Sequence, residues 1–312
     1  MKAGTRKTPS AAKDPSKPPP MQRFGSHVSA AGGLYNAFIE GARVGCDSLQ
    51  IFVKNQRQWA AKPLTDEQIR QYKEAEKSTG LSPVFAHASY LINLASPDDA
   101  GREKSITALV DELERCEALG VQGLVVHPGA HLGEGEAAGI ERIGRSLDEV
   151  HRRKAGYNAR VLLETTAGQG STLGRTIEEI QAIIAATANP DRLGVCLDTC
   201  HLFAAGYDLR NKAVCDELIS KIDTLLGSKR VQCIHVNDSK GACGSRLDRH
   251  EHINQGLIGR AGFMNILNDA RLTHAPRILE TPKGEDDAGR DLDKLNLARL
   301  RKMTASDPTK TQ

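Results

Sequence analysis

The chain alternates short apolar runs with longer stretches whose apolar residues recur at helical spacing. The apolar runs predict eight β-strands, near residues 22–28, 48–53, 82–87, 122–127, 160–165, 193–198, 231–237 and 277–281. The longer stretches predict eight helices, near 33–45, 65–79, 101–119, 136–154, 175–187, 212–226, 261–270 and 288–302. Eight strands alternating with eight helices are typical of a (β/α)₈ barrel. We therefore predict an α/β fold that consists of a single TIM barrel.

The predicted barrel occupies residues 22–303, between two tails. Residues 1–21 contain five Lys or Arg, one Asp and three consecutive prolines, which predicts a disordered basic tail. Residues 304–312 are predicted to form a flexible C-terminal tail. The first twenty residues carry a charge of +4, so subtracting them from the total of +3 leaves −1 for the remainder. The barrel thus lacks the overall basic character of a DNA-coating protein.

Cysteine content and hydropathy bear on location. The seven cysteines are an odd number without framework spacing, which favours reduced thiols and an intracellular protein. No apolar run approaches the roughly 18 residues of a membrane helix, so no membrane association is expected. The basic tail suggests a nuclear address. A mitochondrial or cytoplasmic location also remains open. The tail could equally be a solvated extension that no targeting receptor recognises.

Six of the predicted strands end on a side chain that can bind a metal. These side chains are His87, His127, Glu164, Asp198, His235 and Glu280. A single such residue is more often a hydrogen-bonded scaffold residue, a helix cap or an ion-pair partner. Six in succession are hard to attribute to chance, because the carboxyl ends of parallel barrel strands meet at one mouth. The sequence therefore predicts a metal cluster there.

Three further candidates lie just beyond strand ends. His201 follows Asp198 by three residues, and Asp248 and His250 lie in the longest irregular connection, 238–260. The nine candidates are five His, two Asp and two Glu, too many for one Zn²⁺, which takes about four ligands. They suit two or three ions of Zn or Mn, a device for phosphodiester chemistry.

Other histidines and cysteines near these positions are interpreted as structural. His131, His151 and His274 are expected to be scaffold residues, and His252 could support a ligand. Cys196 and Cys200 flank Asp198 and are interpreted as buried, inert thiols rather than ligands.

Several long motifs resemble the endonuclease IV family of apurinic/apyrimidinic (AP) endonucleases, over about residues 22–300. They are Gly25–Gly33 (GSHVSAAGG), Lys54–Trp59 (KNQRQW), Ser89–Leu94 (SYLINL), Ala167–Gly170 (AGQG), Leu197–His201 (LDTCH), Ala204–Asp208 (AAGYD), Val236–Ser239 (VNDS) and Asp248–His250 (DRH). Two segments depart from the family pattern, Thr165–Thr166 and Asn254–Gly256. Neither departure removes a candidate ligand.

The resemblance implies a barrel with three zinc ions, one replaceable by Mn²⁺. It implies His87, His127 and Glu164 on the first zinc, with Glu164 bridging to the second. Asp198, His235 and Glu280 would complete the second site, and His201, Asp248 and His250 the third. The implied catalytic residues are Glu164, for the bridged pair, and Glu280, which would also orient the nucleophile.

The same resemblance implies the substrate and its contacts. Family members cut double-stranded DNA 5′ to abasic sites, leave a 3′-hydroxyl and a 5′-deoxyribose phosphate, and trim blocked 3′ ends. Arg57, Tyr90 and Leu91 would enter the duplex at the lesion, where an aromatic ring and an aliphatic wedge can fill the gap left by a missing base. The family precedent also implies a monomer.

Two alternatives remain at this stage. A metal-dependent sugar isomerase would share the barrel and six of the ligands but would have no use for His201, Asp248 and His250. A non-catalytic damaged-DNA binder would hold the lesion without nicking it.

Overall fold

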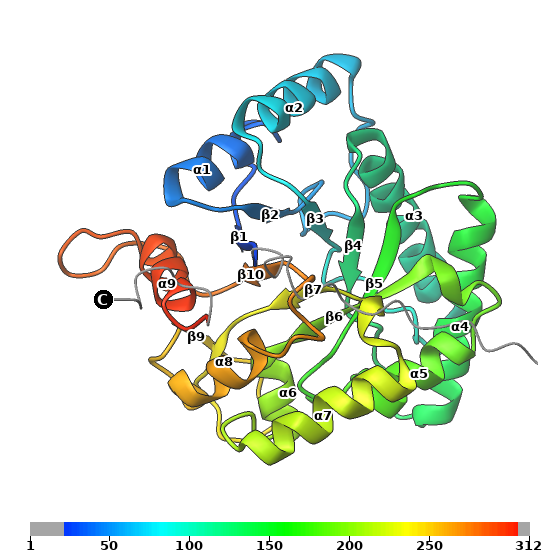
Figure 1. Cartoon of the computed structure of the whole chain (residues 1–312). Coiled ribbons are helices and arrows are strands. Elements are labelled where there is room, and N and C mark those ends of the chain that lie inside the picture. The colour runs from blue at the N-terminus through cyan, green and yellow to red at the C-terminus, as the bar shows by residue number, and fades with distance from the viewer. Residues whose placement is uncertain (1–21, 305–312) are drawn as a thin grey trace, which may run out of the picture.

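The computed structural model describes residues 22–304, within which the strands close into one parallel barrel (Figure 1). The barrel strands are β1 (Phe24–His27), β2 (Ser48–Ile51), β3 (Val84–His87), β4 (Gly123–Val126), β5 (Arg160–Glu164), β6 (Leu193–Asp198), β7 (Val231–His235) and β10 (Arg277–Leu279). Strand β1 closes the ring by pairing in parallel with both β2 and β10. The predicted TIM barrel is confirmed. The predicted tails lie outside the described residues, except for Thr304.

Helices surround the barrel (Figure 1). The predicted ones are α1 (Asn36–Val44), α2 (Asp66–Thr79), α3 (Asp99–Leu119), α4 (Glu136–Arg153), α5 (Ile177–Ala185), α7 (Lys212–Leu225), α8 (Gly259–Leu267) and α9 (Leu292–Arg301). Single turns η1 (Pro190–Arg192) and η2 (Ser228–Arg230) precede β6 and β7. The sequence did not predict α6 (Thr199–Ala205), because seven residues are too few to display helical periodicity.

Local sequence signals explain several element boundaries. Thr65 caps α2: its hydroxyl accepts from Gln68 N, and Gln68 Oε1 accepts from Thr65 N. Gly80 ends this helix at a φ of 69°, a conformation that strains residues with a side chain. Gly25 in β1 is required for space, because a Cβ there would lie 1.9 Å from Ser48 O.

One apolar layer fills the inside of the barrel and forms the floor of its mouth. The layer consists of Phe85, Val125, Leu162, Cys196, Cys233 and Ile278, each at most 2% exposed. Successive side chains of a strand point alternately into and out of the barrel. The residue two positions after each floor residue therefore also points into the barrel, one layer nearer the carboxyl end of the strand. Those residues are His87, His127, Glu164, Asp198, His235 and Glu280. The six candidate ligands therefore point into one mouth, directly above this floor layer. Cys196 is buried, as predicted, and packs in the barrel interior.

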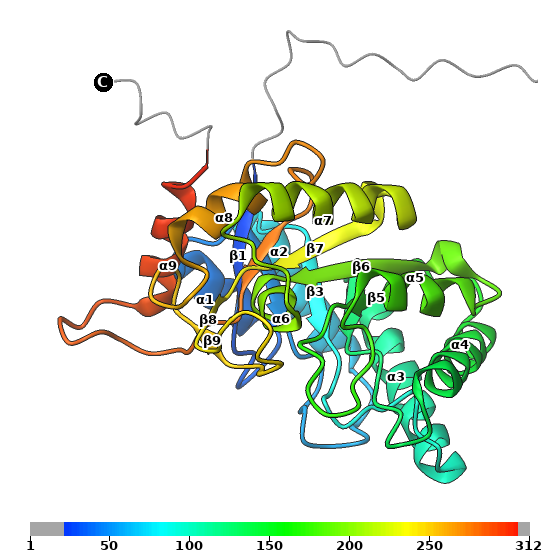
Figure 2. The same ribbon diagram turned by 90° about the horizontal axis from the view of Figure 1, so that it is seen from below.

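The carboxyl ends of the strands carry the long loops. The predicted irregular segment after β7 holds a short antiparallel pair, β8 (Asp238–Ser239) and β9 (His250–Glu251). In Figure 2 this yellow loop and the blue loop after β2 extend from the same end of the barrel. Across residues 22–304, no helix has the length and apolar character required to cross a membrane.

Candidate metal centre

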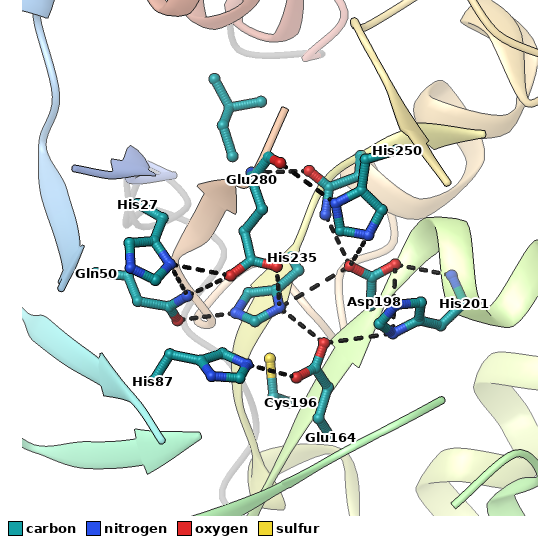
Figure 3. A network of polar contacts seen from close by, with 12 residues as sticks. His27, Gln50, His87, Glu164, Cys196, Asp198, His201, His235, His250 and Glu280 are labelled. Carbon is teal, nitrogen blue, oxygen red and sulfur yellow. Dashed lines mark hydrogen bonds and ion pairs between the residues drawn. The ribbon is translucent and has the colours of Figure 1, made fainter. Parts of the chain in front are cut away.

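All nine predicted ligands lie at the carboxyl-terminal mouth of the barrel (Figure 3 shows seven of them). They form three groups, and within each group the ligand atoms lie within 4.8 Å of one another: His87, His127 and Glu164; Glu164, Asp198, His235 and Glu280; and His201, Asp248 and His250. Glu164 belongs to two groups. These groups match the three sets that the family resemblance implies.

Glu164 lies at the centre of the site. It ends β5 and its side chain is fully buried. Its Oε2 lies 3.1 Å from both His87 Nε2 and His127 Nε2. Its Oε1 lies 3.0 Å from His235 Nδ1 and 3.3 Å from His201 Nδ1. One carboxylate thus contacts four imidazoles, two through each oxygen.

The second group joins β6, β7 and the end of β10. His235 Nδ1 lies 3.1 Å from Glu280 Oε2 and 3.9 Å from Asp198 Oδ2. Asp198 is the last residue of β6 and also caps α6, since its Oδ1 accepts from His201 N at 2.8 Å. The cap leaves Oδ2 facing the mouth, where it accepts from Asn237 Nδ2 at 2.7 Å. The capping interaction therefore orients the carboxylate toward the site.

The third group lies nearer the rim. Asp248 Oδ1 is 3.2 Å from His201 Nε2 and 3.3 Å from His250 Nε2. Asp248 is partly exposed, with 40% of its side-chain surface accessible, whereas His201 is buried on α6. The missed helix α6 therefore matters to the site, because its first turn brings His201 back over the barrel.

Burial and charge act against each other at these groups. Burial alone would raise the pKa of Glu164, but the neighbouring His127 and His235 hold that pKa well below its ordinary value. Burial alone would lower the pKa of His201, but the carboxylate of Asp198 and its neighbours raise it well above. The ionised form of Glu164 is therefore favoured, and a cation that binds beside His201 would compete with a proton for its imidazole.

The donor set fits divalent metal ions. His201 Nε2 and His250 Nε2 are buried and have no hydrogen-bond partner among residues 22–304, although Asp248 Oδ1 lies within 3.3 Å of each. Two unpartnered imidazole nitrogens beside one carboxylate oxygen are what a cation between them would satisfy. Imidazole and carboxylate without thiolate favour Zn²⁺ or Mn²⁺.

His27 and Gln50 also belong to the site and were not predicted. His27 ends β1, and its Nδ1 lies 3.2 Å from Glu280 Oε1. Gln50 of β2 donates to Glu280 Oε1 at 2.6 Å, and its Oε1 lies 2.8 Å from His235 Nε2. Through these contacts, His27 and Gln50 orient the candidate ligands Glu280 and His235. His27 carried the same strand-end signal as the ligands, whereas an amide such as Gln50 carries none.

Of the three predicted DNA-contact residues, Tyr90 is placed at the mouth. It is 62% exposed and lines a cavity of about 180 Å³ together with His127, His250 and Glu280. Leu91 is half-buried next to it, and Arg57 is exposed in the loop after β2, one residue from Gln56, which also lines the cavity. The three side chains therefore lie on the two loops that border one side of the mouth.

Two of the three histidines interpreted as scaffold residues, and also His252, have local side-chain partners, whereas His151 Nδ1 is buried without a hydrogen-bond partner among residues 22–304. His131 Nδ1 accepts from Gly133 N and Gly135 N, and His274 Nε2 lies 2.9 Å from Val231 O. His252 Nδ1 lies 3.0 Å from Asn296 Nδ2. Each of these contacts holds a loop or turn in place.

The chain matches known proteins over most of its length. A family model described as "Xylose isomerase-like TIM barrel" matches residues 38–298. A "Probable endonuclease 4" of Chloroflexus aggregans is 49% identical, with 91% of this chain and 98% of the relative covered. Another, of Geobacter sulfurreducens, is 46% identical and covers 92% and 96%. The crystal structure of endonuclease IV from Thermus thermophilus superposes with a TM-score of 0.78 at 36% identity, over 90% of this chain and 98% of that one.

The fold and the family model define the class of the protein as a xylose isomerase-like TIM barrel. That class is broad, since a D-tagatose 3-epimerase-like protein at 18% identity shares the fold with a TM-score of 0.67. The relatives of higher identity are more specific. The chain belongs to the endonuclease IV family.

Proposed function

We propose that the protein is a DNA-repair endonuclease that hydrolyses the phosphodiester bond 5′ to abasic sites. The products would be a 3′-hydroxyl and a 5′-deoxyribose phosphate, and blocked 3′ ends would be trimmed by the same hydrolysis. The observation that carries the proposal is the set of three ligand groups at one mouth, two of which share Glu164. Family membership supports it, since the relatives are named endonuclease 4.

The proposed cofactor is three Zn²⁺ ions per chain, with Mn²⁺ possible at one site. His87 and His127 would hold the first ion, Asp198, His235 and Glu280 the second, and His201, Asp248 and His250 the third, with Glu164 shared between the first two. Divalent ions would supply a water-derived nucleophile at neutral pH and offset the charge of the phosphate.

The protein's own groups have distinct tasks in this scheme. Glu164 would hold the first two sites at a fixed separation, because each of its oxygens faces a different imidazole pair. Glu280 would orient the attacking water, since Gln50 and His27 hold its Oε1 while Oε2 faces His235. Tyr90 and Leu91 would enter the duplex and occupy the space of the missing base, with Arg57 beside them.

Sugar isomerisation explains fewer of the residues. Such an enzyme would use the groups around Glu164, but it would give no role to the third group. The unpartnered nitrogens of His201 and His250 would then stay buried at a cost. The exposed Tyr90 beside the mouth also favours a large substrate over a small sugar.

The deciding experiment uses one duplex with a single tetrahydrofuran abasic analogue, which cannot undergo β-elimination. The protein, with its metal content measured, should nick this strand 5′ to the analogue, leave a 3′-hydroxyl and contain close to three metal ions per chain. A protein with full metal content that leaves the duplex intact but binds it tightly would be a damage-binding protein. One that neither binds nor cuts it would point to sugars as substrates.

The proposed partner is double-stranded DNA with abasic sites or blocked 3′ ends, bound by a monomer. An intracellular location is proposed as well, and it is supported by the free thiols of all seven cysteines. The nuclear, mitochondrial and cytoplasmic alternatives depend on the basic tail, which lies outside the described residues.

A further inference from the structure

Three charged residues of α3 and one lysine after β2 form a network beside the mouth, in which only Asp111 is partly exposed. The side chains of Lys54 and Glu112 are each 1% exposed, with Lys54 Nζ 3.4 Å from Glu112 Oε1. Arg115 is 5% exposed and pairs with Asp111 through Nε at 3.2 Å. Burying charges is costly unless each one is paired and hydrogen-bonded. The partners of this network are therefore informative, and they lie in the loops that follow β2 and β3.

Glu112 holds the loop after β3. Its two carboxylate oxygens accept from Ser89 N at 3.2 and 3.3 Å. Ser89 Oγ donates to Gln56 O at 2.6 Å and accepts from Leu91 N at 3.2 Å. Ser89 thus lies between the carboxylate of α3 and the segment Tyr90–Leu91, and it ties that segment to the neighbouring loop.

Lys54 and Arg115 hold the loop after β2 at two further points. Lys54 Nζ donates to Trp59 O at 2.8 Å and lies 3.2 Å from Asp111 Oδ2. Arg115 Nη2 donates to the carbonyl oxygens of residues 61 and 62, at 3.1 and 2.7 Å. All three hydrogen bonds end on backbone carbonyl oxygens. They therefore fix the course of the loop and not the side chains it carries.

The side chains at the tips of these two loops are left free. Tyr90 is 62% exposed, and Arg57 is exposed as well. Across residues 22–304, neither the Tyr90 hydroxyl nor the Arg57 guanidinium has a hydrogen-bond partner. A group that enters a duplex must be held in place by its backbone while its side chain stays unpaired. Otherwise binding must also order the loop, which weakens affinity.

We propose that Lys54, Glu112 and Arg115 are positioning residues that hold the two lesion-probing loops at a fixed separation. The inference rests on the proposed function and extends it from the probing residues to the network behind them. The network fixes both loops to one rigid helix, so Arg57 and Tyr90 meet the DNA as one preformed surface. The network touches neither the DNA nor the metal ligands in this scheme, so its loss should weaken lesion binding and leave bond hydrolysis intact.

The test is the substitution Glu112→Gln in the full chain. Glutamine keeps the size of the side chain, but it has one acceptor oxygen where Glu112 uses two, and it carries no charge to pair with Lys54. We expect the dissociation constant and the KM for the tetrahydrofuran duplex to rise about tenfold or more, as about 1.4 kcal/mol of lost binding free energy would produce. The kcat at saturating duplex should change much less. Hydrolysis of bis(p-nitrophenyl) phosphate, which needs no probing loop, should stay at the wild-type rate with wild-type metal content.

The matched control is Glu114→Gln, on the same helix. Glu114 is 46% exposed and pairs with Lys154, the residue directly after the neighbouring α4. It should leave both duplex binding and ester hydrolysis unchanged. Glu112→Gln with wild-type duplex affinity would overturn the inference. So would a parallel loss of duplex cleavage and ester hydrolysis, because that result indicates general damage to the fold or the metal site.

A second variant covers the case in which Glu112→Gln does not fold. Ser89→Ala removes the hydroxyl between Gln56 O and Leu91 N without leaving a buried charge unpaired. It should raise the KM for the duplex in the same direction, by about threefold or more, the loss expected for one or two neutral hydrogen bonds. An unchanged KM would overturn the inference. Wild-type protein that fails to cut the duplex at all would refute the proposed function instead, so the two failures are distinguishable.

Discussion

The substitution Glu164→Gln tests the centre of the proposed site. The carboxylate is fully buried, and its two oxygens lie 3.0–3.3 Å from four imidazole nitrogens. Glutamine preserves the shape of the side chain but replaces one oxygen with an amide NH₂ group that cannot bind a cation. We expect the variant to fold, to bind less metal and to lose most of its incision activity.

The size of the effect follows from burial. Removing one partner from a buried ionic arrangement costs about 3–5 kcal/mol. If that loss falls on the metal-loaded reaction, and each tenfold in rate corresponds to about 1.4 kcal/mol, incision should slow by about 10² to 10⁴. The smaller loss of rate, about 10²-fold, is expected if the ions rearrange around the amide oxygen that remains.

The assay is incision of the tetrahydrofuran duplex, with metal content and thermal unfolding measured on the same preparation. The control Glu117→Gln makes the same chemical change at a carboxylate that accepts hydrogen bonds from Asn158 N and Ala159 N, before the start of β5 and away from the mouth. It should cost some stability and no activity. A folded, fully metal-loaded Glu164→Gln that cuts at nearly the wild-type rate would refute the role given to this residue.

Three further outcomes are expected. Tyr90→Ala should weaken binding of the lesion duplex by about tenfold, measured by fluorescence anisotropy, because stacking on an aromatic ring contributes about 1–3 kcal/mol; equal affinity would remove Tyr90 from the interface. Asp248→Asn should lower the metal content by about one ion per chain, since it weakens one group of ligands only; native mass spectrometry that finds the full complement would contradict this. His151 is buried in α4, and burial, with Arg192 nearby, lowers its pKa from 6.5 to about 4. Its neutral form is favoured in the folded state, so stability present above pH 6.5 should be lost as the pH falls toward 4, by up to about 3 kcal/mol. Urea unfolding of the protein and of His151→Gln at pH 7 and 4.5 measures that loss, and a pH-independent difference between the two would count against it.

The main architecture could be predicted because each barrel strand and its helix carry local signals. The strand at Arg160–Glu164 has a continuous apolar run, and the helix at Asp66–Thr79 has a capping box and a terminal glycine. The elements that were missed are short, since α6 has seven residues and β8 and β9 have two each. So few residues cannot show a hydrophobic period. Helix α6 forms because Asp198 caps it, and β8 forms by pairing with β9, where Ser239 lies opposite His250.

The sequence by itself determined which residues could bind metal, because strand-end His, Asp and Glu are visible in the order of residues. Only the tertiary structure decided how they group. Glu164 meets His87 and His235 because closure of the barrel places β5 midway between β3 and β7, and no spacing along the chain encodes that arrangement. Gln50 joins the site for the same reason.

The buried network of Lys54, Glu112 and Arg115 shows the same limit more clearly. In the sequence these residues look like ordinary charges of a loop and a solvated helix. Packing of α3 against the loops after β2 and β3 removes these three side chains from water. A buried charge is costly unless it is paired and hydrogen-bonded, so burial requires specific partners for each of them. Local order along the chain determines elements and candidate chemistry. Closure of the barrel decides which side chains meet, and at what distance.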